Sequence, residues 1–418
     1  MNPETRSRTI VAFVWILRIS IGVVFITSGL AKTIDLWGTV YKIEEYLKVW
    51  HMWQPRSLVF MASFLLAGIE FVLGSLLLIG AYRRASVWLL LLMMCGMLPL
   101  TLYIYVSNPV SDCGCFGDML LLSNAATFWK NVVISAGLIF LCCFNRRVAP
   151  LFSPWIQWLV TALLIAYTMI VGLYGYNIQP MVDFRSFPAG SAILSSDDNI
   201  SRARFIYVKD GEKREFDMDN LPGEEWTYVG RVEDSDKKLP TEMAVFDSYG
   251  EDVTADVIPL EGHAIILVVP EISRAEVSYT YFLNELNERI TADGGSMLAI
   301  VSGADTEIEM WRDLAMAEYP VYSAESTLLK ELSRGNMSIV SLSNGIIDWK
   351  QNLSTVDSDT FLKEYQPSDP ESVAPFDGPA TLRYLSLLLA VILGVLYMLD
   401  STGRLLRWKI NHGFKSRF

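Results

Sequence analysis

The stretch VAFVWILRISIGVVFITSGL, residues 11–30, carries a single charged side chain, Arg18. An apolar run of about 20 residues is long enough to cross the hydrocarbon core of a membrane as a helix. Five further runs have comparable length and composition: Leu58–Gly80, Val87–Val106, Phe128–Phe144, Trp155–Tyr174 and Leu382–Leu399. The sequence therefore predicts a membrane all-α bundle of six spanning helices, with the first four as its core and two further helices beside them.

The first run has a second interpretation. Gly29-Leu30-Ala31 resembles the small-x-small site at which a secretory signal is cleaved. The run is longer than a usual signal core and contains Arg18, so we expect a retained helix.

Composition and charge divide the chain into two kinds of segment. Hydrophobic residues make up 52% of the 418 residues and charged residues 19%, which is too apolar for a soluble protein and too charged for a purely membrane one. Residues 175–380 hold 38 acidic and 16 basic side chains, and the remainder holds 8 and 18. An acidic, solvated domain is expected there, and its charge argues against nucleic acid as a partner.

Lysine and arginine in the short loops and tails predict the orientation, because cytoplasmic loops of membrane proteins carry an excess of them. These residues are Arg6, Arg8, Arg83, Arg84, Arg146, Arg147, Arg404, Arg407, Lys409, Lys415 and Arg417. All of them fall on one side of the predicted bundle. We therefore expect a multi-pass protein of a bacterial inner membrane, with both termini cytoplasmic and residues 175–381 in the periplasm.

After the fifth run, long apolar segments give way to short alternating ones with turn signals, which is typical of soluble β and α structure. Hairpins are expected for Phe205–Val208 with Arg214–Met218, and for Val245-Phe246 with Asp252–Ile258. Six parts are predicted: 1–150, a four-helix membrane domain; 151–180, the fifth helix and a linker; 181–259, a hairpin-rich lobe; 260–365, an α/β domain; 366–381, a proline-rich tether; and 382–418, the last helix and a basic tail.

The α/β domain is predicted to be thioredoxin-like from the order of its elements. They are a strand at His263–Val269, a helix ending near Asp293, a strand at Met297–Val301, helices at Thr306–Glu318 and Leu328–Leu332, and a hairpin of Ser338–Leu342 with Ile346–Trp349. Redox-active domains of this kind carry Cys-x-x-Cys after the first strand, where this chain has Pro270–Ala275 without cysteine. The proline that usually precedes the final hairpin is replaced by Asn336-Met337. We expect this domain to bind a partner without exchanging disulfides.

The external loop SDCGCFGD, residues 111–118, contains the candidate chemistry. A disulfide between Cys113 and Cys115 would close a small ring with strained geometry, so it should be easily reduced, in a compartment that is oxidising. Gly114 permits the tight backbone, and Phe116 with Gly117 returns the chain toward the fourth span. This pattern favours a redox pair that accepts electrons from partner thiols.

Charged neighbours should tune these thiols. Asp112 and Asp118 are expected to raise the pKa of the cysteines, and a cation such as Lys32 or Lys130 could offset them. Two alternatives stay open, a static disulfide and half of a zinc site. A tetrahedral zinc site needs about four ligands, and no further cysteine is predicted on this face, so no metal is expected.

Polar groups inside the spans are costly unless they are paired, so Arg18 and Glu70 are candidates for function. Counting about 1.5 Å per residue from the ends of the runs puts the two side chains level, and we expect an ion pair between them. The remaining cysteines, Cys95, Cys142 and Cys143, are expected to be small buried residues that fill the apolar core. The alternative is a thiol relay in which Cys95 faces Cys142 or Cys143.

The first four spans resemble the MauE/DoxX family of redox-associated membrane proteins over about residues 10–145. The matching patterns are Arg18-x-x-x-Gly22-x-x-Phe25-x-x-x-Gly29-x-x-Lys32, Glu70-x-x-x-Gly74, and Cys113-Gly-Cys115-Phe-Gly117. The resemblance implies a redox role for the two cysteines and makes Arg18, Lys32 and Glu70 family polar positions. Family members are associated with thiol oxidation, maturation of periplasmic enzymes, or quinone-linked oxidoreductases. The fusion to a cysteine-free thioredoxin-like domain resembles long family members of Bacteroidetes.

These observations give two functional hypotheses. In the first, an inner-membrane protein exchanges thiol and disulfide through Cys113 and Cys115 with a periplasmic thiol protein or a membrane oxidoreductase subunit. In the second, the protein is a non-catalytic scaffold with a structural disulfide; a transporter built around Arg18 and Glu70 is a weaker third. Quinone is the one cofactor that the resemblance allows, and autonomous transfer from dithiol to quinone is not expected because a second thiol pair is missing.

Overall fold

The computed structural model describes residues 3–110, 112–145, 150–194, 204–209, 212–217, 227–231, 243–366 and 369–415. Internal contacts divide the chain into two compact units. The membrane unit comprises Met1–Tyr176, Pro180–Val182 and Phe376–Phe418, and the α/β unit comprises Asn177–Gln179 and Asp183–Pro375. Each unit is described by itself below.

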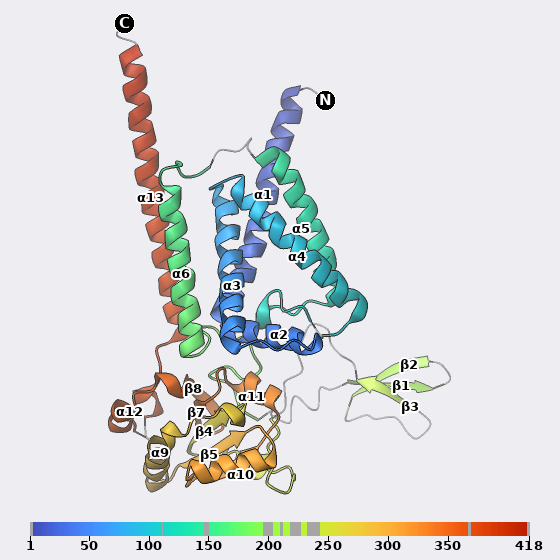
Figure 1. Cartoon of the computed structure of the whole chain (residues 1–418), viewed down its shortest axis with the longest axis vertical. Helices are drawn as coiled ribbons and strands as arrows, with labels where there is room; N and C mark the ends of the chain where they lie inside the picture. The colour runs from blue at the N-terminus through green and yellow to red at the C-terminus, as the bar shows by residue number, and fades with distance from the viewer. Residues whose placement is uncertain are drawn as a thin grey trace. The chain divides into compact units, whose positions relative to one another are not determined.

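The described chain contains six helices that are long and apolar enough to cross a membrane. They are α1 (Pro3–Ile34), α3 (Arg56–Ile79), α4 (Ala85–Ser107), α5 (Asn124–Phe144), α6 (Gln157–Asn177) and α13 (Gly378–Lys415). Each contains all or nearly all of one predicted span, and together they suit a membrane helical bundle. A shorter helix, α2 (Leu36–Val49), lies across the direction of the bundle helices (Figure 1). It begins where the Asp35 side chain accepts a hydrogen bond from the Gly38 backbone N–H (2.9 Å), which ends α1 and caps the new helix.

Small residues bring α1 and α3 close together. A Cβ atom on Gly29 would overlap the backbone of Phe71 and lie 2.8 Å from the carbonyl oxygen of Ala67. A Cβ atom on Gly74 would lie 2.7 Å from the Cβ of Phe25. Membrane helices lack a hydrophobic driving force between them, so close backbone approach at glycine is a principal source of their packing. The α1–α3 contact therefore depends on these two glycines.

The glycine contacts also fix the relative level of the two helices. Gly22 packs against Gly74 and Leu78, and the place of a side chain on Gly80 is filled by the Arg18 guanidinium. Arg18 is therefore level with the end of α3, and the predicted Arg18–Glu70 ion pair is wrong. The count from the ends of the apolar runs assumed that the two helices end together, whereas α1 continues beyond the end of α3.

Arg18 is satisfied by other groups. Its Nε donates to the carbonyl oxygen of Leu77 (3.2 Å) and its Nη2 to that of Leu78 (3.3 Å), and the guanidinium lies 4.7 Å from the centre of the Trp15 ring. These carbonyl groups are in the last turn of α3, where the regular i to i+4 helical bonds end and oxygen atoms can accept further hydrogen bonds.

The α/β unit is built on a five-stranded sheet in the order β6-β5-β4-β7-β8. The strands are β4 (His263–Val269), β5 (Ser296–Val301), β6 (Val321–Ser323), β7 (Ser338–Ser343) and β8 (Ile346–Asn352). Strands β4, β5 and β6 are parallel, and β7 pairs antiparallel with both β4 and β8. The surrounding helices are α8 (Thr254–Val257), α9 (Thr280–Ala292), α10 (Asp305–Leu314), α11 (Ser326–Leu332) and α12 (Ser358–Glu364).

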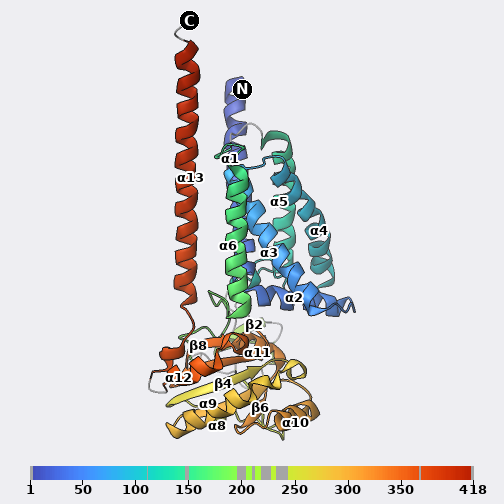
Figure 2. The same ribbon diagram turned by 60° about the vertical axis from the view of Figure 1, so that its left-hand side comes forward.

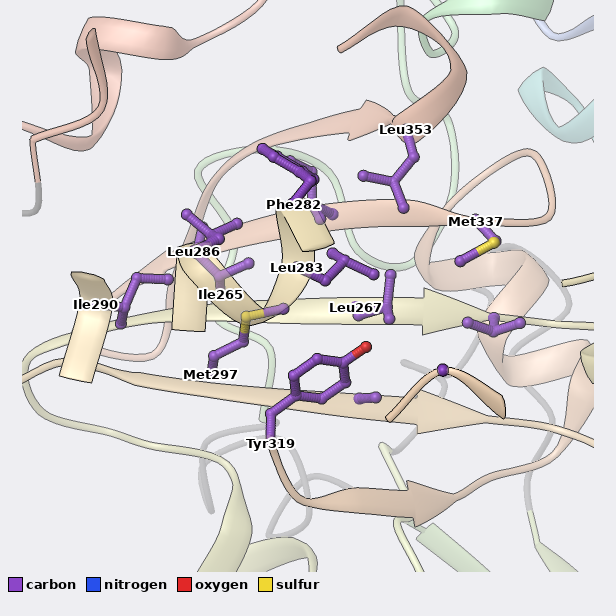
Figure 3. Packing of buried hydrophobic residues seen from close by; sticks show 14 of the residues in the cluster. Ile265, Leu267, Phe282, Leu283, Leu286, Ile290, Met297, Tyr319, Met337 and Leu353 are labelled. Carbon is purple, nitrogen blue, oxygen red and sulfur yellow. The ribbon is translucent and has the colours of Figure 1, made fainter. Parts of the chain in front are cut away.

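The central strand β4 is apolar throughout because both of its faces are covered. Ile265 and Leu267 lie in one core cluster with Leu283 and Leu286 of α9, as Figure 3 shows. The alternate residue Ile266 belongs to a second cluster on the other face of the sheet. This arrangement explains the continuous apolar run that indicated a buried strand.

Two details differ from the prediction. Helix α10 ends at Leu314 and not at Glu318, because Met316 adopts a left-handed backbone conformation (φ 42°) that a helix cannot continue through. Asp252 pairs with Phe246 in a single bridge, and the expected second strand is replaced by α8. The Asp252 side chain accepts from the backbone N–H of Thr254 (3.0 Å), which favours a helix start over a strand.

A separate antiparallel sheet has the order β2-β1-β3 and consists of β1 (Arg204–Lys209), β2 (Glu212–Asp217) and β3 (Thr227–Arg231). The predicted hairpin Phe205–Val208 with Arg214–Met218 corresponds to β1 and β2, and Met218 itself lies outside the described residues. Figure 2 gives a second view of the sheets and helices.

The glycine interface yields a direct test. Gly29→Ala should lower the free energy of unfolding of the full-length protein in detergent by roughly 1–3 kcal/mol, because the added methyl group meets the Phe71 backbone. The matched control is Gly96→Ala in α4, where an added Cβ meets nothing within 4 Å, and it should leave stability unchanged or slightly raised. Equal loss in both variants would contradict a special role for the α1–α3 contact.

Candidate thiol site

The loop between α4 and α5 is held in a tight turn around Gly114. Helix α4 ends at Ser107 and is followed by Asn108, which has a left-handed backbone (φ 45°). The Asp112 side chain accepts a hydrogen bond from the Gly114 N–H (2.7 Å), and Gly114 has φ +66°. A Cβ atom there would also lie 2.7 Å from the Cγ of Lys42. Both the backbone conformation and the space therefore require glycine between the cysteines.

This turn brings the two thiols together. The Sγ atoms of Cys113 and Cys115 lie 2.8 Å apart, and the residues are 7% and 8% exposed. They belong to a buried cluster with Ile104, Val110 and Phe116. The two sulfur atoms are therefore in direct contact, without a bond between them, in an apolar setting.

Helix α2 covers the loop. The hydroxyl of Tyr46 donates to the carbonyl oxygen of Cys113 (3.0 Å), and the Lys42 ammonium lies 3.2 Å from Asp112 Oδ2. Lys42 and Tyr46 are four residues apart and so share one face of the helix. The loop is held at its backbone and at its acidic side chain by the same helix face.

A buried ion pair lies on the other side of the loop. The Lys32 ammonium is 2.6 and 2.7 Å from the two oxygens of Glu70, and both residues are at most 3% exposed. Ser28, one turn before Lys32, has its hydroxyl oxygen 2.6 Å from Glu70 Oε2 and 2.6 Å from the carbonyl oxygen of Cys115. The hydroxyl has one proton, so it can donate to one of these acceptors at a time.

A cavity of about 30 Å³ lies between the ion pair and the cysteine loop. Its polar lining comes from Ser28, Lys32, Glu70, Cys115, Lys130 and Asn131, and its apolar lining from Val24, Phe25, Met93, Met94, Met97 and Ile134. The Lys130 ammonium lies 4.5 Å from the centre of the Phe116 ring, a favourable contact between a cation and an aromatic face. Within the described part of the chain, Lys130 forms no ion pair with a carboxylate.

Two family models match parts of the chain. The family model of the methylamine utilisation protein MauE matches residues 10–144, which include the ion pair, the cysteine turn and Lys130. Residues 10–144 are a MauE domain. A domain of unknown function (DUF8463) matches residues 202–238, of which the structure describes the strands β1, β2 and β3. No curated protein and no solved structure gave a significant match. The chain is thus a multi-pass membrane protein with a MauE domain.

Within the MauE domain, the surroundings make the two cysteines unequal. The hydrogen bond between the two sulfur atoms lowers the pKa of Cys115; burial opposes this, and the Lys130 and Lys32 ammonium groups lower it further, to about 7. The same hydrogen bond, together with burial, raises the pKa of Cys113. Cys115 is therefore the thiolate near neutral pH, and Cys113 keeps its proton.

The cations thus outweigh the acids at this site. The sequence indicated Asp112 as a group that raises the thiol pKa, but its carboxylate is bound to Lys42 and to the Gly114 N–H. The offset by Lys32 and Lys130 that the sequence suggested agrees with the lowered pKa of Cys115.

The structure brings together most of the predicted site residues: Cys113, Cys115, Asp112, Gly114, Phe116, Gly117, Lys32 and Glu70. Asp118 lies in the short 3₁₀ turn Gly117–Met119 that follows. Arg18 is not part of the site. Cys95, Cys142 and Cys143 are exposed on the helices and not buried, so the interpretation as core fillers is wrong.

Sequence reasoning missed Ser28, Lys42, Tyr46 and Asn131. A signal in the spacing was present for the first three of them. Ser28 precedes Lys32 by one helical turn, and Lys42 precedes Tyr46 by one turn, so each pair shares a face.

Among the described residues, no group of three or more His, Cys, Asp and Glu side chains could hold a metal ion.

Removing the carboxylate of the buried pair should be costly. Glu70→Gln leaves the Lys32 ammonium without its ion-pair partner, and the free energy of unfolding should fall by about 3–5 kcal/mol. The control Glu45→Gln breaks the partly exposed Lys42–Glu45 pair, whose side chains are 21% and 43% exposed, and it should cost about 1 kcal/mol or less. Denaturation of both full-length variants in the same detergent tests this, and a loss below the control's would show that the buried pair is not structural.

Lys130 should control the reactivity of Cys115. Lys130→Met raises the pKa of the Cys115 thiol by about one unit, which makes alkylation at pH 7 roughly fivefold slower. The rate against pH should rise through about 7 in the unchanged protein and through a higher pH in the variant. Iodoacetamide labelling of Cys115, followed by mass spectrometry, measures both curves; superimposable curves would exclude Lys130 as the counter-ion.

Proposed function

We propose that the MauE domain carries out thiol–disulfide exchange with a partner protein through Cys113 and Cys115. The observation that carries this proposal is the buried contact between the two sulfur atoms, 2.8 Å apart, beside the Lys130 ammonium. The contact supplies a pair that can form a disulfide without moving the backbone far, and the cation supplies an activated thiolate.

The exchange is balanced in both directions. The Cys115 thiolate attacks one sulfur of a partner disulfide, the partner S–S bond breaks, and the released partner thiolate takes a proton. Cys113 then loses its proton and attacks Cys115 in the mixed disulfide, which releases the second partner thiol. The partner gains two electrons and two protons, and the pair becomes a disulfide. In reverse, the oxidised pair accepts two electrons from a partner dithiol, and an oxidising compartment favours this direction.

The direction of the chain in the membrane forms part of the proposal. Arg83 and Arg84 lie in the loop between α3 and α4, and the cysteine loop lies between α4 and α5, so the two loops are at opposite ends of α4. The positive-inside rule supports cytoplasmic termini and a periplasmic cysteine loop in a bacterial inner membrane. The partner would then be a periplasmic thiol protein or a membrane oxidoreductase subunit.

The α/β unit is proposed to be a thioredoxin-like domain that binds the partner and takes no part in the exchange. Its strand order and the antiparallel β7–β8 hairpin support the fold. Cysteine is absent from Pro270–Ala275, and the Met337 sulfur there accepts a hydrogen bond from the Glu276 N–H (3.1 Å). A thioether in this position cannot form a disulfide, which supports binding without exchange.

Quinone does not fit the cavity beside Cys115. Pockets for ligands of that size measure roughly 300–1,000 Å³, and this cavity measures about 30 Å³. No step of the proposed exchange passes through a quinone.

Single-cysteine variants test the proposal. With oxidised glutathione as the probe, the purified reduced Cys113→Ser protein should accumulate a mixed disulfide on Cys115, because the resolving thiol is absent. Cys115→Ser should form little, since the pKa of Cys113 is raised. Mass spectrometry of the cysteine peptides measures both.

The control variant is Cys95→Ser, which lies outside the site and should behave as the unchanged protein. If neither site variant forms a mixed disulfide, and the unchanged pair stays oxidised in dithiothreitol, Cys113 and Cys115 form a static disulfide. The scaffold function would then replace the exchange.

A further inference from the structure

Continued oxidation of a partner requires an oxidant that returns Cys113 and Cys115 to the disulfide. The remaining thiols, Cys95, Cys142 and Cys143, are exposed on the helices and are not part of the site. The cavity beside Cys115 is the one feature of the described site that could admit a second reactant. Its size and lining therefore bear on the nature of that oxidant.

The cavity holds a molecule of about two oxygen atoms. A single water-sized sphere needs about 10–15 Å³ measured in the same way, and the cavity offers about 30 Å³. Its lining includes hydrogen-bonding groups from Ser28, Lys130 and Asn131 together with apolar side chains. A small polar molecule with two adjacent oxygen atoms matches both the volume and the hydrogen-bonding groups.

We propose that hydrogen peroxide enters this cavity and reoxidises the Cys113–Cys115 pair. This inference rests on the exchange proposed above and names the oxidant of that same site. The supporting geometry is a cavity of the right size that is lined by the Cys115 residue, with a second thiol 2.8 Å from its sulfur.

The reaction balances in two steps. The Cys115 thiolate attacks one oxygen of the peroxide, the O–O bond breaks, and the hydroxide that leaves takes a proton to become water. Cys115 is then a sulfenic acid. The Cys113 thiol attacks the Cys115 sulfur, an S–S bond forms, and the hydroxyl group leaves with the Cys113 proton as a second water. One peroxide and one dithiol give one disulfide and two waters.

The residues around the cavity suit both steps. The Lys130 ammonium, which has no carboxylate partner among the described residues, can stabilise first the thiolate and then the departing hydroxide. Lys32 is neutralised by Glu70, so it contributes less. The Cys113 sulfur is 2.8 Å from that of Cys115, so it is placed to attack the sulfenic acid before a second oxidant molecule reacts.

The experiment uses the reduced full-length protein in lipid nanodiscs. Loss of free thiols is followed after addition of hydrogen peroxide, of cumene hydroperoxide, or of air-saturated buffer alone. Hydrogen peroxide should oxidise the pair at least about tenfold faster than it oxidises free glutathione at pH 7, through its thiolate and the cation beside it. Cumene hydroperoxide, whose aromatic ring exceeds the cavity, and air should both be slow. The product should lose two hydrogens and gain no oxygen by mass.

Two variants examine the cavity itself. Ile134→Phe adds bulk to the cavity lining and should slow the peroxide reaction by about tenfold or more, with little change in exchange with oxidised glutathione. Ile139→Phe changes an exposed residue of the same helix and should leave both rates unchanged. Cys113→Ser treated with peroxide should accumulate a sulfenic acid that dimedone labels on Cys115.

Three results would overturn the inference: a peroxide rate no faster than that of glutathione, equal rates for both peroxides, or equal rates for the two isoleucine variants. Exchange with oxidised glutathione is measured on the same samples. If that exchange persists while the peroxide reaction is slow, the peroxide inference is wrong and the exchange function stands. If both are absent, the exchange function itself fails.

Discussion

The close contact of α1 with α3 is the constraint on which the rest of the MauE domain depends. Glycine at positions 29 and 74 allows the two backbones to touch, and this contact sets the level at which Lys32 meets Glu70. The buried ion pair is tolerable only because its geometry is good and Ser28 supplies a further hydrogen bond. The ion pair in turn forms the floor of the cavity beneath Cys115. The helix contact therefore places the ion pair, and the ion pair in turn lines the cavity at which the thiol chemistry takes place.

The cysteine turn obtains its chemistry from elements that are distant in sequence. Helix α2 holds the turn through Tyr46 and Lys42, and α5 contributes Lys130 from the opposite side. With these contacts the two thiols, which are identical in sequence terms, differ in acidity: the pKa of Cys115 is lowered and that of Cys113 is raised. The asymmetry belongs to the folded domain and not to the Cys-Gly-Cys sequence.

Much of the fold could be predicted from the sequence. The apolar runs of spanning length and the continuous apolar strand His263–Val269 each follow from a local pattern, and the structure contains them. The partner of Glu70 could not be predicted, because the level of two helices depends on which glycines touch and not on where the apolar runs end. The cover by α2 was missed for a similar reason: its amphipathic pattern shows that one face is buried, but not what it is buried against.

The Ser28 hydroxyl has a further consequence. It stands between the Cys115 carbonyl oxygen and the Glu70 carboxylate at the same distance from each, and its one proton cannot serve both. A displacement of the cysteine turn that moves the Cys115 carbonyl oxygen therefore changes the hydrogen bond between Ser28 and Glu70. Because Glu70 pairs with Lys32, the change also reaches the α1–α3 contact. The cysteine turn and the α1–α3 pair are therefore linked through one hydroxyl group, so a bond between the sulfur atoms would alter the hydrogen bonding of Glu70.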